Sequence, residues 1–424
     1  KGSTVAAAVE AAPNQVRNAM LVVAVQDQSA KAMAFAAKTL KTFQSPSDQP
    51  SNAALSGLLK WCANQPPSLT LKRFGPAHTW LLAVEDSMAA CGVEPTPAML
   101  STLLSAYGNA GNVERVFSVL QTLKQQQQQQ QQKHEQEARL PPSSSAAADP
   151  RAPALRLLSK GVYLAVLRSL RQASVPTPAS RDLAADPSAL INGLLVDMSA
   201  QGVQVDVDVL KAALRVFAQT LRHVELLNEN VDALEAHPAD RDLIASKAWE
   251  LFLSTTKGTK WHPAVEPDLD TYNLLLKVFT HANDLNRATG LLEAMAGEEP
   301  TLAPTVESYN ILLRILAKRD WMGCEDLFTL MTNRNLAPNE STMDGILNGY
   351  ADSERAPAAV SMAQSVFNQY GAKPTQPVFL RVLELLLQEG DLAEARRAAF
   401  VFKQIWPEDT DLLDRTGGSY GFKL

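Results

Sequence analysis

The sequence has few of the residues that mark a disulfide scaffold, a metal site or a catalytic centre. Its three cysteines, Cys62, Cys91 and Cys324, are far apart and form no CxxC pair, which excludes a disulfide framework and a zinc ribbon. None of the six histidines forms an HExxH motif, and neither a GxxxxGK[ST] phosphate loop nor a GxSxG nucleophile turn is present. We therefore expect a protein that is not an enzyme and that uses no cofactor or metal ion.

The chain also lacks long apolar runs and a strong excess of either charge. No apolar stretch reaches the length of about 18 residues that marks a membrane-spanning helix. The 39 Lys and Arg residues are set against 45 Asp and Glu residues, which gives a net charge of −6. This balance argues against a diffuse cationic surface, but one local basic stripe is enough to bind a nucleic acid.

Leu and Ala dominate the apolar residues and long β-branched runs are scarce, which favours a mostly helical chain. One segment differs in composition: Gln125–Gln132 is an unbroken glutamine run, and a stretch rich in Pro, Ser and Ala follows it. We interpret residues 125–154 as an extended helix end followed by a low-complexity insertion. Because this insertion has no periodic apolar face, we expect it to be dispensable for folding.

The apolar residues recur in units of a few dozen residues, and each unit holds two amphipathic helices, here called helix A and helix B. Tyr272 and Tyr309 lie 37 residues apart, and each precedes an Asn and an apolar run. Helix A carries an apolar pair, at Leu58-Leu59, Leu103-Leu104, Val166-Leu167, Ala213-Leu214, Leu275-Leu276, Leu312-Leu313, Ile346-Leu347 and Val382-Leu383. Helix B carries apolar residues at i, i+3, i+4 and i+7, most clearly at Ala288, Leu291, Leu292 and Met295. Units leave helix B through Gly92, Asn335 or Gly371, and a Pro follows each of them.

These anchors place repeat starts near residues 15, 52, 97, 160, 207, 269, 306, 340 and 376. The predicted array spans residues 15–408, and residues 409–424 form a C-terminal tail that we expect to be solvated. The predicted fold is all-α: a right-handed α-solenoid superhelix of stacked helix-turn-helix hairpins, with helix A on the concave side.

The repeats resemble the pentatricopeptide repeat family over most of the chain. The marks of this resemblance are T-Y-N and S-Y-N at the start of helix A, L-F-x-x-M at the end of helix B, and P-D, P-T or P-N junctions. Tetratricopeptide repeats have the same length, but their helix A typically carries a Trp and a Leu-Gly that these units lack. The resemblance implies RNA binding. We expect neither the deaminase domain nor the aspartate-rich nuclease domain of some family members.

In this family the fifth residue of helix A and the last residue of the repeat together read one base. The resemblance implies the following base-facing pairs: Ser56 with Thr96, Leu164 with Asp206, Lys211 with Asp268, Asn273 with Thr305, Asn310 with Asn339, and Asp344 with Thr375. Ser101 and Leu380 hold the fifth position in two further units. Only Asn310 with Asn339 matches the family's reading pairs well. Since leucine cannot hydrogen-bond a base edge, contiguous sequence-specific reading is not expected.

A basic stripe follows one helical turn after the fifth position. The ninth residue of helix A is basic in five of eight repeats, although Lys and Arg make up about 9% of the chain (39 of 424). The five residues are Lys60, Arg168, Arg215, Lys277 and Arg314. One cation per stacked repeat suits a phosphate backbone, so we predict that this basic stripe binds RNA phosphates. The alternative is that these residues have no ligand and are basic only because this face of helix A is exposed to solvent.

Three functions remain open on the sequence alone. The first is an RNA-binding scaffold of organellar gene expression, in particular a structural subunit of a mitochondrial ribosome that grips rRNA by its shape and backbone together with other proteins of the assembly. The second is a free factor for the stability, splicing or translation of one transcript. The third is an adaptor whose groove binds a protein. The expected location is the mitochondrion, with the chloroplast as the alternative.

Overall fold

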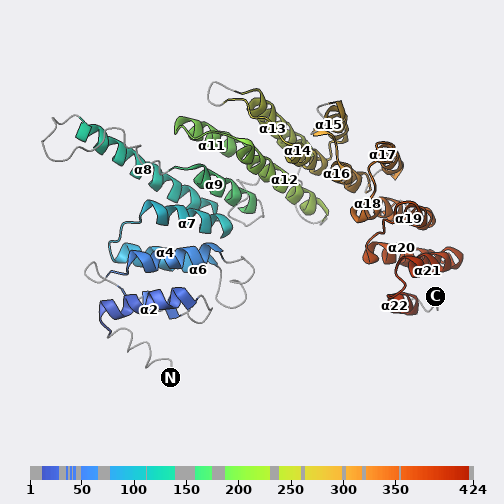
Figure 1. Cartoon of the computed structure of the whole chain (residues 1–424), viewed down its shortest axis with the longest axis horizontal. Helices are drawn as coiled ribbons and strands as arrows, with labels where there is room; N and C mark the ends of the chain where they lie inside the picture. Colours follow the sequence, from blue (N-terminus) through green and yellow to red (C-terminus); the bar gives the residue numbers. More distant parts are fainter. Residues whose placement is uncertain are drawn as a thin grey trace. The chain divides into compact units, whose positions relative to one another are not determined.

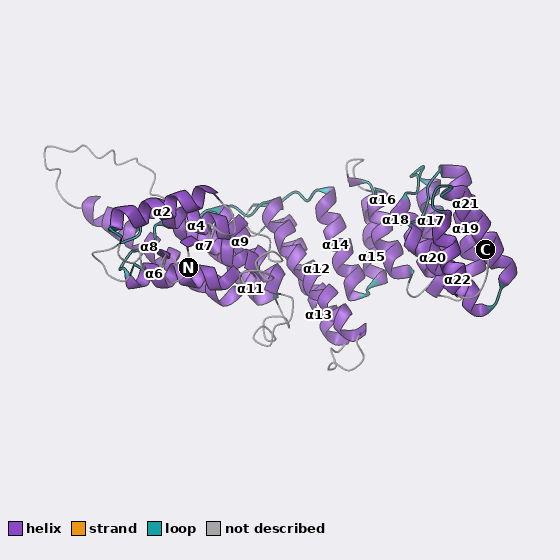
Figure 2. Cartoon of the chain, turned by 90° about the horizontal axis from the view of Figure 1, so that it is seen from below, coloured by secondary structure: helices purple, strands orange, loops and turns teal. Residues whose placement is uncertain are grey.

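The computed structural model describes residues 12–27, 35–36, 39–40, 42–43, 49–64, 77–110, 112–138, 158–173, 187–229, 238–258, 263–297, 302–317, 321–352 and 355–419. Within these ranges the chain forms 18 helices. Figure 2 colours the described residues as helices and loops, with no strand among them. The predicted all-α fold class is confirmed. None of the helices in the described ranges has the length and hydrophobicity needed to cross a membrane.

From α4 to α21 the described helices alternate between helix A and helix B of successive repeats, while α2 is a helix A and α22 follows the last repeat. Their bounds are α2 (Asn14–Asp27), α4 (Asn52–Asn64), α6 (Ala77–Ala90), α7 (Pro97–Ala110), α8 (Val113–Ala138), α9 (Lys160–Ala173), α11 (Ser188–Ala200), α12 (Val207–Glu229), α13 (Pro238–Lys257), α14 (Leu269–Ala282), α15 (Leu285–Gly297), α16 (Val306–Leu316), α17 (Trp321–Asn333), α18 (Glu340–Asp352), α19 (Ala356–Tyr370), α20 (Gln376–Glu389), α21 (Leu392–Ile405) and α22 (Thr410–Ser419). A helix begins at or next to each of the nine positions where the sequence places a repeat start.

The chain forms two compact units, one of residues 1–223 and 251–265 and the other of residues 224–250 and 266–424. In the first unit, helix A of each repeat packs beside helix A of the next, in the order α2, α4, α7 and α9. In the second unit the same stacking joins α14, α16, α18 and α20, and each of these pairs with the helix that follows it (Figure 1). Both units are therefore stacks of helical hairpins, as the repeat pattern predicts.

The predicted apolar pairs form the core of both units. All sixteen side chains of the eight helix A pairs are buried, and Leu312 and Leu313 are fully so. The helix B pattern is buried as well, for example at Ala288 and Met295. Fully burying one leucine contributes about 1.5–3 kcal/mol to folding, so each of these pairs adds several kcal/mol to the attraction between neighbouring helices.

Polar residues fix the ends of the helices. At the start of α14 the Asp268 side chain accepts a hydrogen bond from the Thr271 backbone N–H at 3.0 Å. Such a cap satisfies a donor that the first helical turn leaves unpaired. At the predicted exit turns, Gly92 and Asn335 adopt positive φ values of 63° and 59°. Glycine and asparagine tolerate this left-handed conformation best, so they end a helix and turn the chain back.

Buried tyrosines tie helix A to a carboxylate of helix B. The Tyr107 hydroxyl donates to Glu85 Oε2 at 2.7 Å, and the Tyr163 hydroxyl donates to Asp197 Oδ2 at 2.8 Å. Tyr350 donates in the same way to the Glu325 carboxylate. Burial, followed by these hydrogen bonds, raises the pKa of each of the three phenols above its ordinary value. These contacts keep the phenols protonated inside the fold.

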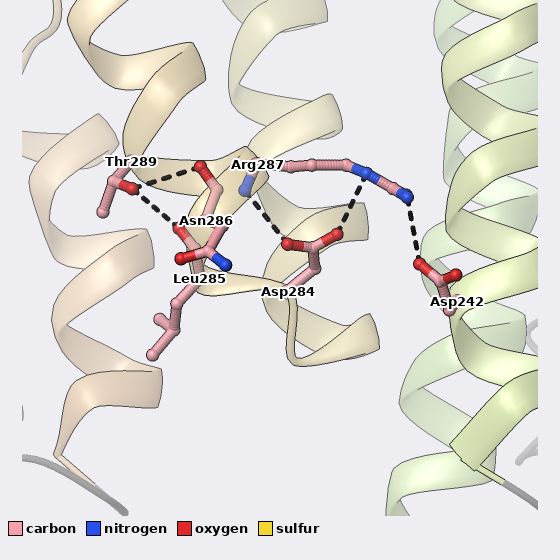
Figure 3. A network of polar contacts seen from close by, with 6 residues as sticks. All are labelled: Asp242, Asp284, Leu285, Asn286, Arg287 and Thr289. Carbon is pink, nitrogen blue, oxygen red and sulfur yellow. Dashed lines mark hydrogen bonds and ion pairs between the residues drawn. The ribbon is translucent and has the colours of Figure 1, made fainter.

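In the second unit an arginine joins two consecutive helix B elements. Arg287 of α15 places Nη2 3.0 Å from Asp242 Oδ1 of α13 and Nε 3.1 Å from Asp284 Oδ2 (Figure 3). The Arg287 backbone N–H also donates to Asp284 Oδ1 at 3.0 Å, because Asp284 caps α15. The guanidinium fork thereby fixes the start of α15 against α13.

The expectation that the glutamine run adds nothing to the fold is wrong for its first residues. Gln125–Gln132 continues α8, and Gln127 is buried. Its Nε2 donates to Gln201 Oε1 at 2.9 Å, and its Oε1 accepts from the Leu158 backbone N–H at 3.1 Å. A glutamine side chain carries both a donor and an acceptor, so one residue bridges two segments of the first unit without an apolar face. Residues 139–154 of the predicted insertion lie outside the described residues.

The C-terminal tail also differs from its expected form. Residues 410–419 form α22, which packs against α20, and Leu413 is fully buried. Asp409 accepts a hydrogen bond from Gln376 Nε2 at 2.5 Å. The short apolar pattern of α22 was too brief to distinguish from a solvated end, but one buried leucine suffices to dock it on the last helix A.

Candidate nucleic-acid interface

The residues of the basic stripe all lie on helix A with side chains open to solvent. In the first unit Lys60, Arg168 and Arg215 are exposed on α4, α9 and α12. In the second unit Arg314 is exposed on α16, while the Lys277 side chain on α14 is 36% exposed. In each case the cation directly follows the buried apolar pair. The periodicity that buries the pair therefore turns the ninth residue toward water.

Among the described residues, one member of the basic stripe forms an ion pair within the protein. Lys277 Nζ lies 3.1 Å from Glu307 Oε1, at the second position of the next helix A. Such an exposed ion pair is worth about 1 kcal/mol or less, but it lowers the net charge that α14 offers to an anion. Sequence reasoning missed this pairing because the two residues belong to different repeats.

Two cations of the basic stripe meet at a cavity between α9 and α12. The cavity has a volume of about 280 Å³ and is lined by Leu164, Leu167, Arg168, Arg171, Asp208, Lys211, Ala212 and Arg215. We call it the cation cavity, because four of these eight residues are basic. Arg168 and Arg215 are predicted phosphate ligands, so the structure brings two of the five together and adds two more cations beside them.

The sequence predicts a role for one of the two added cations and not for the other. Lys211 holds a fifth position and is therefore a predicted base-facing residue, but it lines the same cavity as the arginines. Arg171 was not predicted at all, although it lies three residues after Arg168 and so on the same helical face. That spacing was the signal that could have revealed it.

The cation cavity exists because α9 and α12 are not packed tightly against each other. On its other side, α9 packs so closely on α7 that a Cβ at Gly108 would lie 2.9 Å from the Ala165 carbonyl oxygen. The backbones of α9 and α12 make little contact of this kind. Long basic side chains occupy the rim of this wider space.

The one carboxylate of the cation cavity is already engaged outside it. Lys160 Nζ donates to Asp208 Oδ2 at 2.7 Å and also to Asp206. Hydrogen bonds to Asp206 and then to Asp208 raise the pKa of Lys160, so this lysine stays charged. Part of the Asp208 charge is thus balanced by Lys160, and the cation cavity remains strongly positive.

The last residues of the repeats, which are predicted to face bases, are the residues that cap the next helix A. The side chains of Thr96, Asp206, Asp268 and Asn339 each accept a hydrogen bond from the backbone N–H three residues later, at 3.0–3.3 Å. The Thr305 backbone N–H donates to Ser308 Oγ at 3.1 Å, and the Thr375 backbone N–H donates to Asp344 Oδ1 at 2.7 Å. Thr, Asp and Asn are the preferred residues for a helix start. Capping therefore accounts for the residue types of Thr96, Asp206, Asp268 and Asn339 without any reference to RNA.

The asparagines at the fifth position form hydrogen bonds to the next repeat. Asn273 Oδ1 accepts from Ser308 Oγ at 2.7 Å, and Asn310 Oδ1 accepts from Thr342 Oγ1 at 2.7 Å. Asn310 Nδ2 also donates to Asn339 Oδ1 at 3.0 Å, so the two members of the best predicted reading pair bind each other. Asn273 is 4% exposed and Asn310 is 9% exposed. Base reading by these residues stays a prediction, and it requires rearrangement of these internal hydrogen bonds.

The remaining fifth positions provide few donors. Ser56 on α4 and Ser101 on α7 are half-buried, and the Ser101 carbonyl accepts from Ser105 Oγ at 3.1 Å. Leu164 lines the cation cavity. In the part of the chain that the structure describes, no group of three or more His, Cys, Asp or Glu side chains could hold a metal ion.

Comparisons with known proteins agree with the repeat assignment. A family model of the pentatricopeptide repeat domain matches residues 263–319, which include α14, α15 and α16. A model of the PPR repeat matches residues 98–127, which cover α7 and the start of α8. A search of curated proteins finds no match.

Solved structures similar to the chain include the maize pentatricopeptide repeat protein PPR10, at 16% identity and a TM-score of 0.34 over 96% of this chain and 55% of that one. The same protein in complex with an 18-nucleotide psaJ RNA element gives a TM-score of 0.32, at 16% identity over 93% of this chain and 56% of that one. Yeast Rmd9p, in complex with a 16-nucleotide target RNA, shares 11% identity over 96% of this chain and 93% of that one, with a TM-score of 0.38. The chain spans about half the length of the maize protein.

Proposed function

We propose that this chain, a pentatricopeptide repeat protein, binds RNA without catalysing a reaction and holds it mainly through phosphate contacts. The observation that carries the proposal is the cation cavity, where Arg168 and Arg215 of the basic stripe are joined by Arg171 and Lys211. Guanidinium groups match phosphate oxygens with two parallel hydrogen bonds and stay charged at any physiological pH. Such contacts hold a backbone in place and read no sequence.

The polar residues that remain on helix A support backbone binding over base reading. The amide oxygens of Asn273 and Asn310 already accept hydrogen bonds within the protein. A base would have to replace these bonds, which reduces the net gain from reading it. This favours recognition of RNA by shape and charge.

The finer proposal is a structural subunit of a mitochondrial ribosome that grips rRNA together with other proteins of the assembly. Long insertions between repeats and the few good reading pairs fit a permanent place in a large ribonucleoprotein. A free transcript-specific factor would need several consecutive reading pairs, and an adaptor for proteins would leave the cationic residues without a role.

RNA affinity measured over a range of salt concentrations tests the RNA proposal. For single strands each neutralised phosphate steepens the log–log salt slope by about 0.7. We expect a slope of several such increments and similar affinities for unrelated sequences of equal length and structure. A salt-independent affinity, or strong discrimination between sequences, would contradict the proposal.

Purification from an organelle extract, with and without ribonuclease, tests the place in an assembly. A ribosomal subunit is expected to sediment with ribosomal particles and to be released by ribonuclease treatment. Recovery with one messenger RNA outside those particles would favour the transcript-specific factor. Recovery with protein alone, unchanged by ribonuclease, would favour the adaptor.

A further inference from the structure

The cation cavity holds more positive charge than one link of an RNA backbone can neutralise. Arg168, Arg171, Lys211 and Arg215 contribute four positive charges and Asp208 one negative charge, which gives 4 − 1 = +3 around about 280 Å³. Among the described residues Arg168, Arg171 and Arg215 form no ion pair. An internucleotide phosphate carries one negative charge, so a single one leaves most of this repulsion in place.

The uncharged residues that line the cation cavity also favour an anion with more than one negative charge. Leu164, Leu167 and Ala212 provide an apolar wall, and Leu164 stands where a family member would present a base-reading side chain. This wall offers no hydrogen bond to a base edge, and apolar surroundings strengthen the attraction between the cations and an anion. The donors that remain are guanidinium and ammonium groups, which suit clustered phosphate oxygens.

We propose that the cation cavity takes phosphate groups that bring two or more negative charges to one place. Two features of RNA have this chemistry: the 5′-terminal phosphates, and two backbone phosphates that a folded RNA brings side by side. The proposal rests on the proposed RNA-binding function for its source of phosphate. It differs from the basic stripe model, in which each repeat contacts one phosphate of an extended strand.

Tripolyphosphate tests the chemistry of the cation cavity without RNA. We expect it to raise the melting temperature of the full chain, and equal ionic strength of sodium chloride to do so less. The double variant Arg171→Gln with Lys211→Gln should lose this rise. Arg222→Gln, an exposed arginine on α12 that does not line the cavity, is the matched control and should keep it.

The melting temperature without ligand provides a check on folding. Because the cations repel one another, the Arg171→Gln and Lys211→Gln double variant should melt no lower than the wild type. An unchanged response of this variant to tripolyphosphate would overturn the proposal. If the double variant melts much lower than the wild type, Arg168→Lys is used in its place, since this change keeps the charge and removes the guanidinium fork. Arg168→Lys should reduce the rise in melting temperature that tripolyphosphate causes. A rise equal to that of the wild type would count against the proposal.

Three RNAs of matched length and composition then distinguish the sources. They are an unstructured strand with a 5′-hydroxyl, the same strand with a 5′-triphosphate, and a hairpin with a 5′-hydroxyl. We expect the wild type to prefer the second or the third over the first by about tenfold, as one additional charge-assisted contact provides. A preference for the triphosphate identifies the RNA end, and a preference for the hairpin identifies converging backbones.

The double variant Arg171→Gln with Lys211→Gln should abolish this preference, whereas Arg222→Gln should retain it. Equal binding of all three RNAs would overturn the proposal, because the cation cavity would then act as one more backbone contact. Failure of all three RNAs to bind, with the tripolyphosphate response intact, would instead refute the proposed RNA function and leave the preference for clustered charge supported.

Discussion

Helix A is built from the same pattern in two stretches of the chain, but its polar positions behave in opposite ways. In the second unit, on α14, α16 and α18, Asn273 and Asn310 bind hydroxyl groups of the next repeat, and Lys277 pairs with Glu307. In the first unit, α9 and α12 have a leucine and a lysine at the same fifth positions, and their cations surround a cavity. In α14 and α16, Asn273, Asn310 and Lys277 bind other residues of the protein. In α9 and α12, the basic side chains of Arg168, Arg171 and Arg215 remain available to bind an anion.

The contrast indicates where a ligand gains most. Side chains that already hydrogen-bond within the protein must exchange those bonds to reach a ligand, so their net contribution to affinity is small. Arg168, Arg171 and Arg215 form no ion pair among the described residues, so they repel one another, and an anion relieves that repulsion. The repeats that match the family pattern best are therefore expected to carry stability, and the poorly matching repeats of α9 and α12 to carry affinity.

The largest expected effect is on the packing of the regular region. Replacement of Leu312 by Ala removes a fully buried side chain between α16 and its neighbours and should lower the free energy of unfolding by about 2–5 kcal/mol. Urea denaturation measures this loss. Leu330→Ala on α17 is the control, since that side chain is 40% exposed, and its cost should stay within about 0.5 kcal/mol. Equal losses would show that the buried pairs do not carry the stability.

The next effect concerns RNA and compares the two stretches directly. Changing Arg168 and Arg215 together to Gln should flatten the log–log salt slope of RNA binding by about 1.4, which is two phosphate contacts on a single strand. Changing Lys277 and Arg314 to Gln removes the same formal charge, but Lys277 is already paired with Glu307. The second pair should therefore flatten the slope by less. An equal decrease in the salt slope for both double variants would show that the two stretches contribute equally to phosphate binding and would contradict the contrast between them.

A smaller effect is expected at Asn310, whose side chain binds within the protein. Asn310→Ala removes one hydrogen bond from the Thr342 hydroxyl and one from Asn339 Oδ1, but these two groups keep their hydrogen bond to each other. The change should therefore cost about 0.5–1.5 kcal/mol of unfolding free energy. RNA affinity should change little for any sequence. Asn348→Ala is a control on the neighbouring helix A, because within the described part of the chain the Asn348 side chain accepts a hydrogen bond only from the exposed Arg381. An altered base preference with unchanged stability in Asn310→Ala would favour the transcript-specific alternative.

The fold was largely predictable because its determinants are local. The apolar pairs follow the helical period, and Gly92, Asn335 and Gly371 mark helix ends by their backbone conformation, so each signal lies within one repeat. Leu413 docks α22 although its sequence context is short, and Gln127 bridges residues 31 and 74 positions away. Such long-range contacts leave no periodic signal.

The candidate site was predictable only in part for the same reason. Arg168 and Arg215 follow from their position in the repeat, but their meeting with Lys211 depends on the width of the gap between α9 and α12. The pairing of Asn310 with Asn339 depends on the approach of two repeats. The family pattern predicts the role of a residue from its position in the repeat. The contacts that its side chain makes depend on how neighbouring hairpins pack.

The smallest expected effect tests whether the interiors of the two units are alike. Tyr163 and Tyr350 are buried in different units and both donate to a carboxylate, which together with burial raises the pKa of each phenol. Below the unfolded pKa of about 10 both states keep the proton, so stability is independent of these groups. Above it the unfolded chain loses protons that the folded chain retains, so the free energy of unfolding should fall as pH rises.

Tyr163→Phe and Tyr350→Phe should each reduce this alkaline loss, by similar amounts, in urea denaturation series from neutral to alkaline pH. Tyr370→Phe on α19 is the control, because that side chain is 38% exposed and donates to no carboxylate among the described residues. Similar responses at Tyr163 and Tyr350 would place the difference between the two stretches on the polar surface of helix A. A response at only one of them would show that the hairpin interiors of the two units also differ. The difference between the polar positions of helix A would then reflect a difference in core packing.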